Sequence, residues 1–204
     1  MKFLYKLFIF LNNRFIIIAT KNLGYLYFKL NNINFKKGLS CNGLPFLSVQ
    51  GEFLIGENFK NNNRVESNPI GGNYKCLFVV RRNAKLSIGN NVGFSGVSIV
   101  CTNHISIGNN VKIGANTCIY DTDFHSLNKE YRRDQKKDFN DIQTKAVIIG
   151  DDVFIGAHST ILKGVKIGDG SIIGACSVVT KNIQKDEIWA GNPAKFIKKI
   201  NYDN

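Results

Sequence analysis

Three histidines, His104, His125 and His158, are the side chains of this chain that can exchange a proton near neutral pH. They lie 21 and 33 residues apart, and no short His-x-x-x-x-His pair occurs among them. This spacing argues against a three-histidine metal centre, and we expect no metal. His125 differs from the others because it lies near the start of a polar stretch, residues 120–146, in which twelve residues are charged.

The remaining reactive residue types form no recognisable site. Five cysteines stand at least 17 residues apart, at Cys41, Cys76, Cys101, Cys118 and Cys176. Without a Cys-x-x-Cys pair they indicate neither zinc nor redox chemistry. An odd, scattered set predicts free thiols that pack as small core residues in the reducing cytoplasm. The chain also lacks the P-loop, Gly-x-Gly-x-x-Gly and Gly-x-Ser-x-Gly motifs.

Composition predicts one globular domain, with or without an appendage. The chain has 204 residues, of which 44% are apolar and 21% charged. The formal net charge is +12, but residues 1–51 alone hold seven basic residues and no acidic one. Because the rest of the chain is only mildly basic and shows no basic stripe, we expect no nucleic-acid binding.

The N-terminal segment is basic and rich in aromatic residues. Residues 1–35 contain nine of the 23 aromatic residues, yet no apolar run exceeds five residues, as in 7–11 and 15–19. A membrane-spanning helix needs about twenty mostly apolar residues, so none is expected, and no cleaved signal is expected either. Two compatible interpretations remain for residues 1–50: a cap on the main domain, or a peripheral contact with an anionic membrane at its inner face.

The main pattern is a six-residue repeat that begins at Leu86. Its recurring apolar residue is followed by Gly in seven of twelve cases. The twelve positions are Ile88, Phe94, Val100, Ile107, Ile113, Ile119, Ile149, Ile155, Ile161, Ile167, Ile173 and Val179.

Such a period predicts an all-β fold, a parallel β-helix with a triangular coil of about 18 residues, in which the recurring residue points inward. Twelve repeats correspond to about four coils, with a weaker sign of an earlier one at Ile55. We place the β-helix domain at residues 51–190, its protruding loop at 120–146 and a tail at 191–204. One extra residue enters between Cys101 and His104, where we expect His104 to fill a bulge.

The run IGDDVFIGAHSTILKGVKIGDGSIIGACSVVTKNI, followed by WAGNPAKFIKKI, resembles the hexapeptide-repeat acetyltransferases. Within them it is most similar to maltose/galactoside O-acetyltransferases and to enzymes that acetylate colanic acid and O-antigen sugars. The resemblance covers residues 67–200, including NPIGG at 68–72 and DTDFHS at 121–126.

The resemblance implies a left-handed β-helix and a homotrimer with three active sites, each in a groove between neighbouring coils. It also implies acetyl transfer from acetyl-CoA to a sugar hydroxyl of a bacterial surface polysaccharide or its precursor. His125 matches the family's general base, which would remove the hydroxyl proton. Asp123 is the candidate for fixing the histidine tautomer, or it forms a turn. His158 is expected to face outward.

Contacts with acetyl-CoA also carry over from the resemblance. Ala157 and Ala175 are 18 residues apart, one coil, and would let the pantetheine arm approach; ordinary corner packing explains them too. Thr180 and Lys181 match the adenine end, and Lys195 and Lys198 would meet the phosphates.

Two other functions stay open. One is an N-acetyltransferase that acts on a nucleotide-linked amino sugar with the same cofactor and base. The other is a non-catalytic β-helix that only binds, against which the intact DTDFHS stretch argues.

Overall fold

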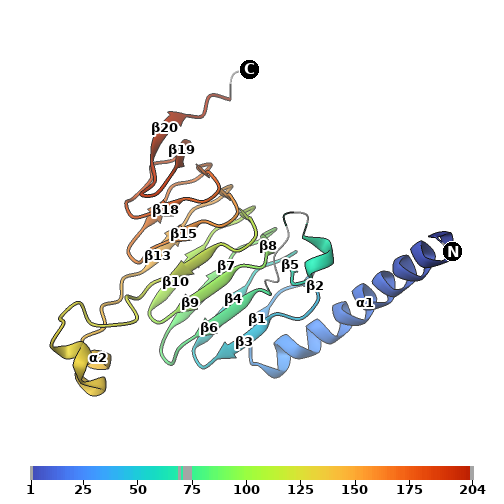
Figure 1. Cartoon of the computed structure of the whole chain (residues 1–204), viewed down its shortest axis with the longest axis horizontal. Helices are drawn as coiled ribbons and strands as arrows, with labels where there is room; N and C mark the ends of the chain where they lie inside the picture. Colours follow the sequence, from blue (N-terminus) through green and yellow to red (C-terminus); the bar gives the residue numbers. More distant parts are fainter. Residues whose placement is uncertain (1, 69, 71–74, 203–204) are drawn as a thin grey trace.

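The chain folds as a parallel β-helix whose three sheets enclose one apolar core (Figure 1). The computed structural model describes residues 2–68, 70 and 75–202. Every strand pairing within the coil is parallel, and only the last pair, β19 with β20, is antiparallel.

The three sheets follow one another along each turn of the coil. The first sheet contains β1 (Asn34–Phe35), β4 (Glu52–Ile55), β7 (Lys85–Ile88), β10 (His104–Ile107), β13 (Val147–Ile149) and β16 (Lys166–Ile167). The second contains β2 (Ser40–Asn42), β5 (Lys60–Asn62), β8 (Gly93–Ser95), β11 (Lys112–Ile113), β14 (Phe154–Ile155), β17 (Ile172–Ile173), β19 (Glu187–Ala190) and β20 (Lys195–Lys199). The third contains β3 (Phe46–Val49), β6 (Leu77–Val80), β9 (Ser98–Cys101), β12 (Cys118–Tyr120), β15 (Thr160–Ile161) and β18 (Val178–Val179).

The coil is longer than the sequence repeat indicates. Six strands stack in the first sheet, whereas the repeat indicates about four coils and a weaker fifth. The structure moves the start of the coil to Asn34, inside the segment assigned to the N-terminal cap. The early coils escape the pattern because β2 and β5 contain Cys41 and Asn61 at their buried positions instead of large aliphatic residues.

Eleven of the twelve repeat positions are buried, and Val100 is the exception. Ile99 points inward in its place and pairs with Ile119 on the next coil. The corner before β9 is one residue short, since Gly96 turns tightly at a φ of 55°, and the corner after it is correspondingly longer. For the same reason His104 fills no bulge: it begins β10, paired with Lys85.

An asparagine ladder closes the corner between the first and second sheets. Asn58 donates to Asn91 at 3.0 Å, Asn91 to Asn110 at 3.1 Å, and Asn110 to Asp152 at 2.9 Å. All four residues have φ between 57° and 58°. Asn and Asp tolerate this left-handed conformation best among residues with a Cβ, so the ladder satisfies the turn and links successive coils.

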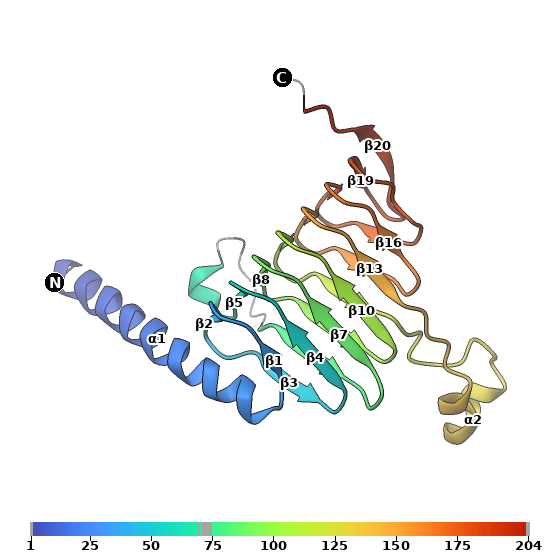
Figure 2. The same cartoon turned by 180° about the vertical axis from the view of Figure 1, so that it is seen from behind.

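The N-terminal helix α1 (Lys2–Leu30) contacts the coil through the part that begins at Thr20. Thr20 donates to the carbonyl of Cys41 at 3.2 Å, Gly24 lies close against Cys41, and Phe28 is fully buried. The preceding part extends away from the coil (Figures 1 and 2), and there Phe3 and Phe15 are 76% and 71% exposed. None of the helices described combines the length and the apolar character that crossing a bilayer requires.

Two further segments leave the coil. Between β12 and β13 the chain forms a loop that carries the 3-10 helix η2 (Tyr131–Arg133) and the helix α2 (Gln135–Asn140) and that projects from the side of the coil (Figure 2). A second 3-10 helix, η1 (Val65–Ser67), follows β5. These three short helices are polar on the whole, and none of their residues is buried.

Candidate active site

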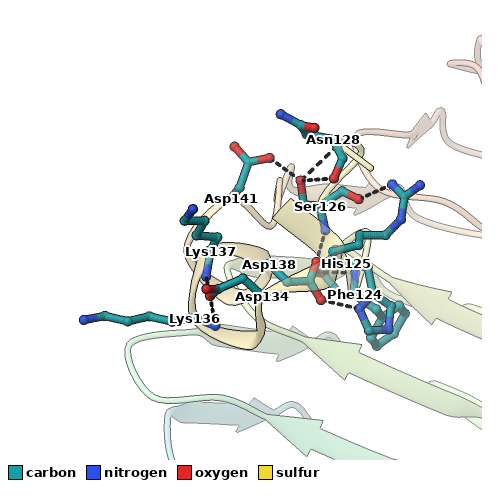
Figure 3. A network of polar contacts seen from close by, with 11 residues as sticks. Phe124, His125, Ser126, Asn128, Asp134, Lys136, Lys137, Asp138 and Asp141 are labelled. Carbon is teal, nitrogen blue, oxygen red and sulfur yellow. Dashed lines mark hydrogen bonds and ion pairs between the residues drawn. The ribbon is translucent and has the colours of Figure 1, made fainter. Parts of the chain in front are cut away.

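The loop at 120–146 is held in one conformation by its own polar side chains (Figure 3). Asp134 caps α2 by accepting hydrogen bonds from the backbone amides of Lys136 and Lys137, each at 3.0 Å. Ser126 donates to Asp141 through its hydroxyl, and Arg132 donates to the carbonyl of Ser126 at 2.7 Å. The histidine next to Ser126 therefore sits on an ordered segment, although its surroundings are polar.

His125 is paired with a carboxylate from α2. Its Nδ1 lies 2.7 Å from Oδ2 of Asp138, whose other oxygen accepts from the backbone amide of Ser126 at 2.6 Å. The His125 contact and then the Ser126 amide hold the pKa of Asp138 below its usual value. A carboxylate at Nδ1 favours the tautomer in which Nε2 carries the lone pair, and the ring is 70% exposed, so Nε2 can accept a proton from a bound molecule.

Asp123 does not hold the histidine, contrary to the sequence expectation. Its carboxylate forms an ion pair with Lys163 at 3.2 Å, and its amide donates to the carbonyl of Gln143 at 3.1 Å. These contacts tie the start of the loop to the coil and to the end of the loop. Asp138 makes the contact that was expected of Asp123, because α2 folds back over His125, which residue spacing alone did not indicate.

The second candidate histidine lies elsewhere. His158 is exposed at the corner between the second and third sheets, with a φ of 60° and its Nδ1 3.1 Å from Nδ2 of Asn116. No group of three His, Cys, Asp or Glu side chains in the described part of the chain has metal-binding geometry.

Ala157 and Ala175 occupy that same corner one above the other. The amide of Cys176 donates to the carbonyl of Ala157 at 2.8 Å, so the two coils stack directly. The amides of Ala157 and Ala175 donate to no residue that the structure describes, and both positions are at least partly exposed. Free amides beside small side chains fit a pantetheine arm, which carries amide groups and needs close approach.

The remaining cofactor candidates divide between two edges. Lys195 begins β20 opposite Ala190, which stacks on Gly174 beside Ala175, and therefore lies near the alanine corner. Lys198 lies further along β20 and is exposed. Thr180 and Lys181 are exposed at the next corner, after β18, so the structure does not bring them together with the alanines.

His125 and the alanine corner are also separate within one chain. His125 belongs to the loop that follows the third-sheet strand β12, whereas Ala157 and Ala175 precede the third-sheet strands β15 and β18. The third sheet therefore lies between the two halves of the candidate site.

Comparisons with known proteins agree with this architecture. The family described as "Bacterial transferase hexapeptide (six repeats)" matches residues 146–181. The Bacillus subtilis (strain 168) protein named "Putative acetyltransferase YvoF" is 32% identical over 157 residues, which is 76% of this chain and 79% of the relative. The chain belongs to the hexapeptide-repeat acetyltransferase family.

Two solved structures illustrate what the acetyltransferase resembles. A galactoside acetyltransferase in complex with coenzyme A is 33% identical, with a TM-score of 0.53, and the match covers 70% of this chain and 64% of that one, slightly less than two thirds. A mutant of AntD, a Bacillus cereus N-acyltransferase in complex with dTDP-4-amino-4,6-dideoxyglucose and coenzyme A, has a TM-score of 0.69. It covers 85% of this chain and 88% of that one, but at 21% identity it shows the shared fold alone.

The relatives identify an acyltransferase that depends on acetyl-CoA. The motif NPIGG at 68–72, which carries part of the resemblance, lies partly outside the described residues. Asp138 is the functional candidate that the sequence reasoning missed. The only local sign of Asp138 in the sequence is the cap residue Asp134, four residues earlier, which marks the start of the short helix that contains Asp138.

Proposed function

We propose that this acetyltransferase moves acetyl from acetyl-CoA to a sugar hydroxyl of a bacterial surface polysaccharide or its precursor. The observation that carries the proposal is the contact between His125 and Asp138, which leaves Nε2 of an exposed histidine free to act as a base. The family membership and the galactoside acetyltransferase neighbour support a sugar acceptor.

In the proposed reaction, Nε2 of His125 removes the proton from the sugar hydroxyl as its oxygen attacks the thioester carbon. Asp138 holds the ring by Nδ1 and stabilises the imidazolium that forms. Backbone amides near the repeat corners stabilise the oxyanion. The carbon–sulfur bond then breaks, and His125 returns its proton to the leaving thiolate.

Replacement of the two exposed histidines tests the base. His125→Ala should lower kcat for thiol release from acetyl-CoA by about 10²–10⁴, the range for losing a general base, while acetyl-CoA binding changes little. His158→Ala is the matched control and should keep most of the activity. Turnover at the wild-type rate in the His125→Ala protein would refute this mechanism.

We propose that a homotrimer completes the site. The third sheet separates His125 from the alanine corner within one chain, so a neighbouring copy must bring its loop to that corner. Light scattering should therefore give three times the chain mass of 22.8 kDa. Mixing His125→Ala chains with chains blocked at Ala175 by a large side chain should restore activity. In a mixed trimer, some grooves then combine an intact alanine corner from a His125→Ala chain with an intact His125 loop from a blocked chain. An active monomer would contradict this arrangement.

A second candidate is N-acetylation of a nucleotide-linked amino sugar. The AntD structure supports it, because the shared fold extends over 85% of this chain and that protein contains an amino-sugar nucleotide. Thiol release measured side by side with sugars, amino sugars and sugar nucleotides separates the two candidates, and mass spectrometry of the products identifies the acetylated atom.

We further propose that the acetyltransferase works as a cytoplasmic enzyme at the inner membrane face, held there by α1. The part of α1 before Thr20 exposes Phe and Leu side chains and contains no acidic residue. Each basic residue near an anionic surface contributes about 1 kcal/mol. Buried aromatic side chains add to that attraction, and three copies on one trimer multiply it.

Removal of residues 1–18 tests this placement without disturbing the cap, because Thr20, Gly24 and Phe28 remain. The full-length protein should sediment with vesicles of phosphatidylglycerol and phosphatidylcholine in a salt-sensitive manner, and the truncated protein should not. Both should bind acetyl-CoA equally. Equal sedimentation of the two proteins would show that α1 serves only as a cap.

A further inference from the structure

A cavity of about 570 Å³ lies where the projecting loop meets the coil. One wall is the corner between the third and first sheets, to which successive coils contribute Gln50, Arg81 and Thr102. The opposite wall belongs to the loop and includes Phe139 and Ile142. The loop that carries His125 contributes half of the lining, including Phe124, which directly precedes His125 in the chain.

The coil wall of the cavity carries uncompensated positive charge. Arg81 and Arg82 are both exposed, and neither forms an ion pair with any residue that the structure describes. No acidic side chain lines the cavity among the residues described. Four carboxylates directly flank lining residues in the chain, and all four are occupied. Asp121 is buried and accepts three hydrogen bonds from the turn after β9, and Asp123 is paired with Lys163. Asp138 is paired with His125, and Asp141 accepts the hydroxyl of Ser126.

The loop wall presents aromatic rings. Phe124 and Phe139 are 45% and 74% exposed, and Phe124 packs edge-on against the ring of Tyr120. Phe124 also has a φ of 64°, which is unfavourable for an aromatic residue and directly precedes His125. Such strain at a residue beside the base is typical of a position that shapes a binding site.

We propose that this cavity binds a phosphate or diphosphate group attached to the acceptor sugar. Arg81 and Arg82 would bind the phosphate oxygens through their guanidinium groups, and Phe124 and Phe139 would contact the flat face of the sugar or of the group beyond the phosphate. The proposal rests on the proposed function and narrows its substrate class: the acceptor is an activated sugar, linked to a nucleotide or to a lipid, instead of a free sugar or a finished polysaccharide.

Inorganic pyrophosphate is the probe, measured by calorimetry on the full-length protein with saturating CoA, so that the phosphate contacts of the cofactor are already occupied. The double variant R81Q/R82Q should raise the Kd of pyrophosphate by at least about tenfold, since charged hydrogen bonds are lost. R133Q is the matched control. Arg133 is an exposed arginine of the loop at 120–146 that pairs with Glu130 and does not line the cavity. R133Q should leave the Kd unchanged.

Two results would overturn the proposal. One is wild-type pyrophosphate binding by R81Q/R82Q. The other is a matching rise in the Kd of acetyl-CoA, which would assign the two arginines to the cofactor. R81K/R82K keeps the charge and should bind with intermediate affinity, which guards against a folding defect in the Gln variant. His125→Ala should bind pyrophosphate like the wild type, so failure of the proposed base does not affect this measurement.

Competition by uridine diphosphate and by farnesyl diphosphate separates the two sources of the phosphate. Tighter binding of the first indicates a nucleotide-linked acceptor, and tighter binding of the second indicates a lipid-linked one. Either result supports the cavity, provided that R81Q/R82Q weakens the tighter ligand.

Discussion

Asp138→Asn is the substitution that most directly examines how the base is prepared. The carboxylate accepts hydrogen bonds from Nδ1 of His125 at 2.7 Å and from the amide of Ser126 at 2.6 Å. Asn has the same shape but one acceptor oxygen and one amide group. If its oxygen keeps the Ser126 contact, its NH₂ faces Nδ1 and favours the tautomer that places the proton on Nε2, where the base needs a lone pair.

The size of the effect follows from the exposure of the pair. Replacing a fully buried triad carboxylate by its amide lowers the rate by about 10⁴-fold. The His125 side chain is 70% exposed, so water can exchange its proton and replace part of the lost contact. The loss should therefore be nearer to that of one charged hydrogen bond, and we expect kcat to fall by about 10- to 100-fold with KM for acetyl-CoA unchanged.

Three measurements distinguish positioning from simple loop support. Asp134→Asn removes the same charge from the other end of α2, where Asn also caps a helix, and should retain nearly full activity. The double variant H125A/D138N should be no slower than H125A alone. Nitrogen NMR of the His125 ring should show the proton moving from Nδ1 to Nε2 in Asp138→Asn. Additive losses in the double variant, or an unchanged tautomer, would refute the reasoning.

Three further outcomes are expected. Cys176 is exposed beside the alanine corner, so iodoacetamide should alkylate it first, and CoA should slow that reaction. Cys101 should stay unmodified, because burial raises the pKa of its thiol to about 12. Mass spectrometry of the labelled peptides checks both results. Carboxyl-carbon NMR should show that Asp138 titrates at a lower pH than an unstructured Asp. The stabilising contact of the Asp138 carboxylate is therefore complete above about pH 4 and is lost only as the pH falls through the lowered pKa. H125A should move the titration midpoint of Asp138 up, because the largest cause of the lowering is removed. Asp121→Ala leaves three donors without a buried acceptor and should lower the free energy of unfolding by at least about 2 kcal/mol, read from denaturant midpoints.

The sequence predicts the coil well because its rule is local. A large apolar residue every six positions, often followed by Gly, is enough to define where the chain turns and which side chains point inward. The rule fails at Val100, since a corner that is one residue shorter changes which residue of β9 is buried. It also misses the coils before Leu86, where Cys41 and Asn61 occupy inward positions that no apolar pattern marks.

The candidate site is only partly readable for a different reason. His125 stands out because it lies at the edge of the repeat, but its partner is 13 residues away across a short helix. Asp123 is nearer in sequence, yet Lys163 of the next coil takes its carboxylate. Which of several acids meets a loop histidine depends on how the loop folds back, and periodicity carries no information about that.

The two ends of the coil bear on whether copies can polymerise. A stack of parallel strands ends in unpaired amides and carbonyls that another stack could extend, as in fibrils. At one end α1 covers the first coil through Gly24 and Phe28. At the other, β20 reverses direction and presents Lys195, Lys198 and Lys199, whose like charges repel a second copy. Loss of either barrier should therefore be seen first as end-to-end filaments, before any change in the coil itself.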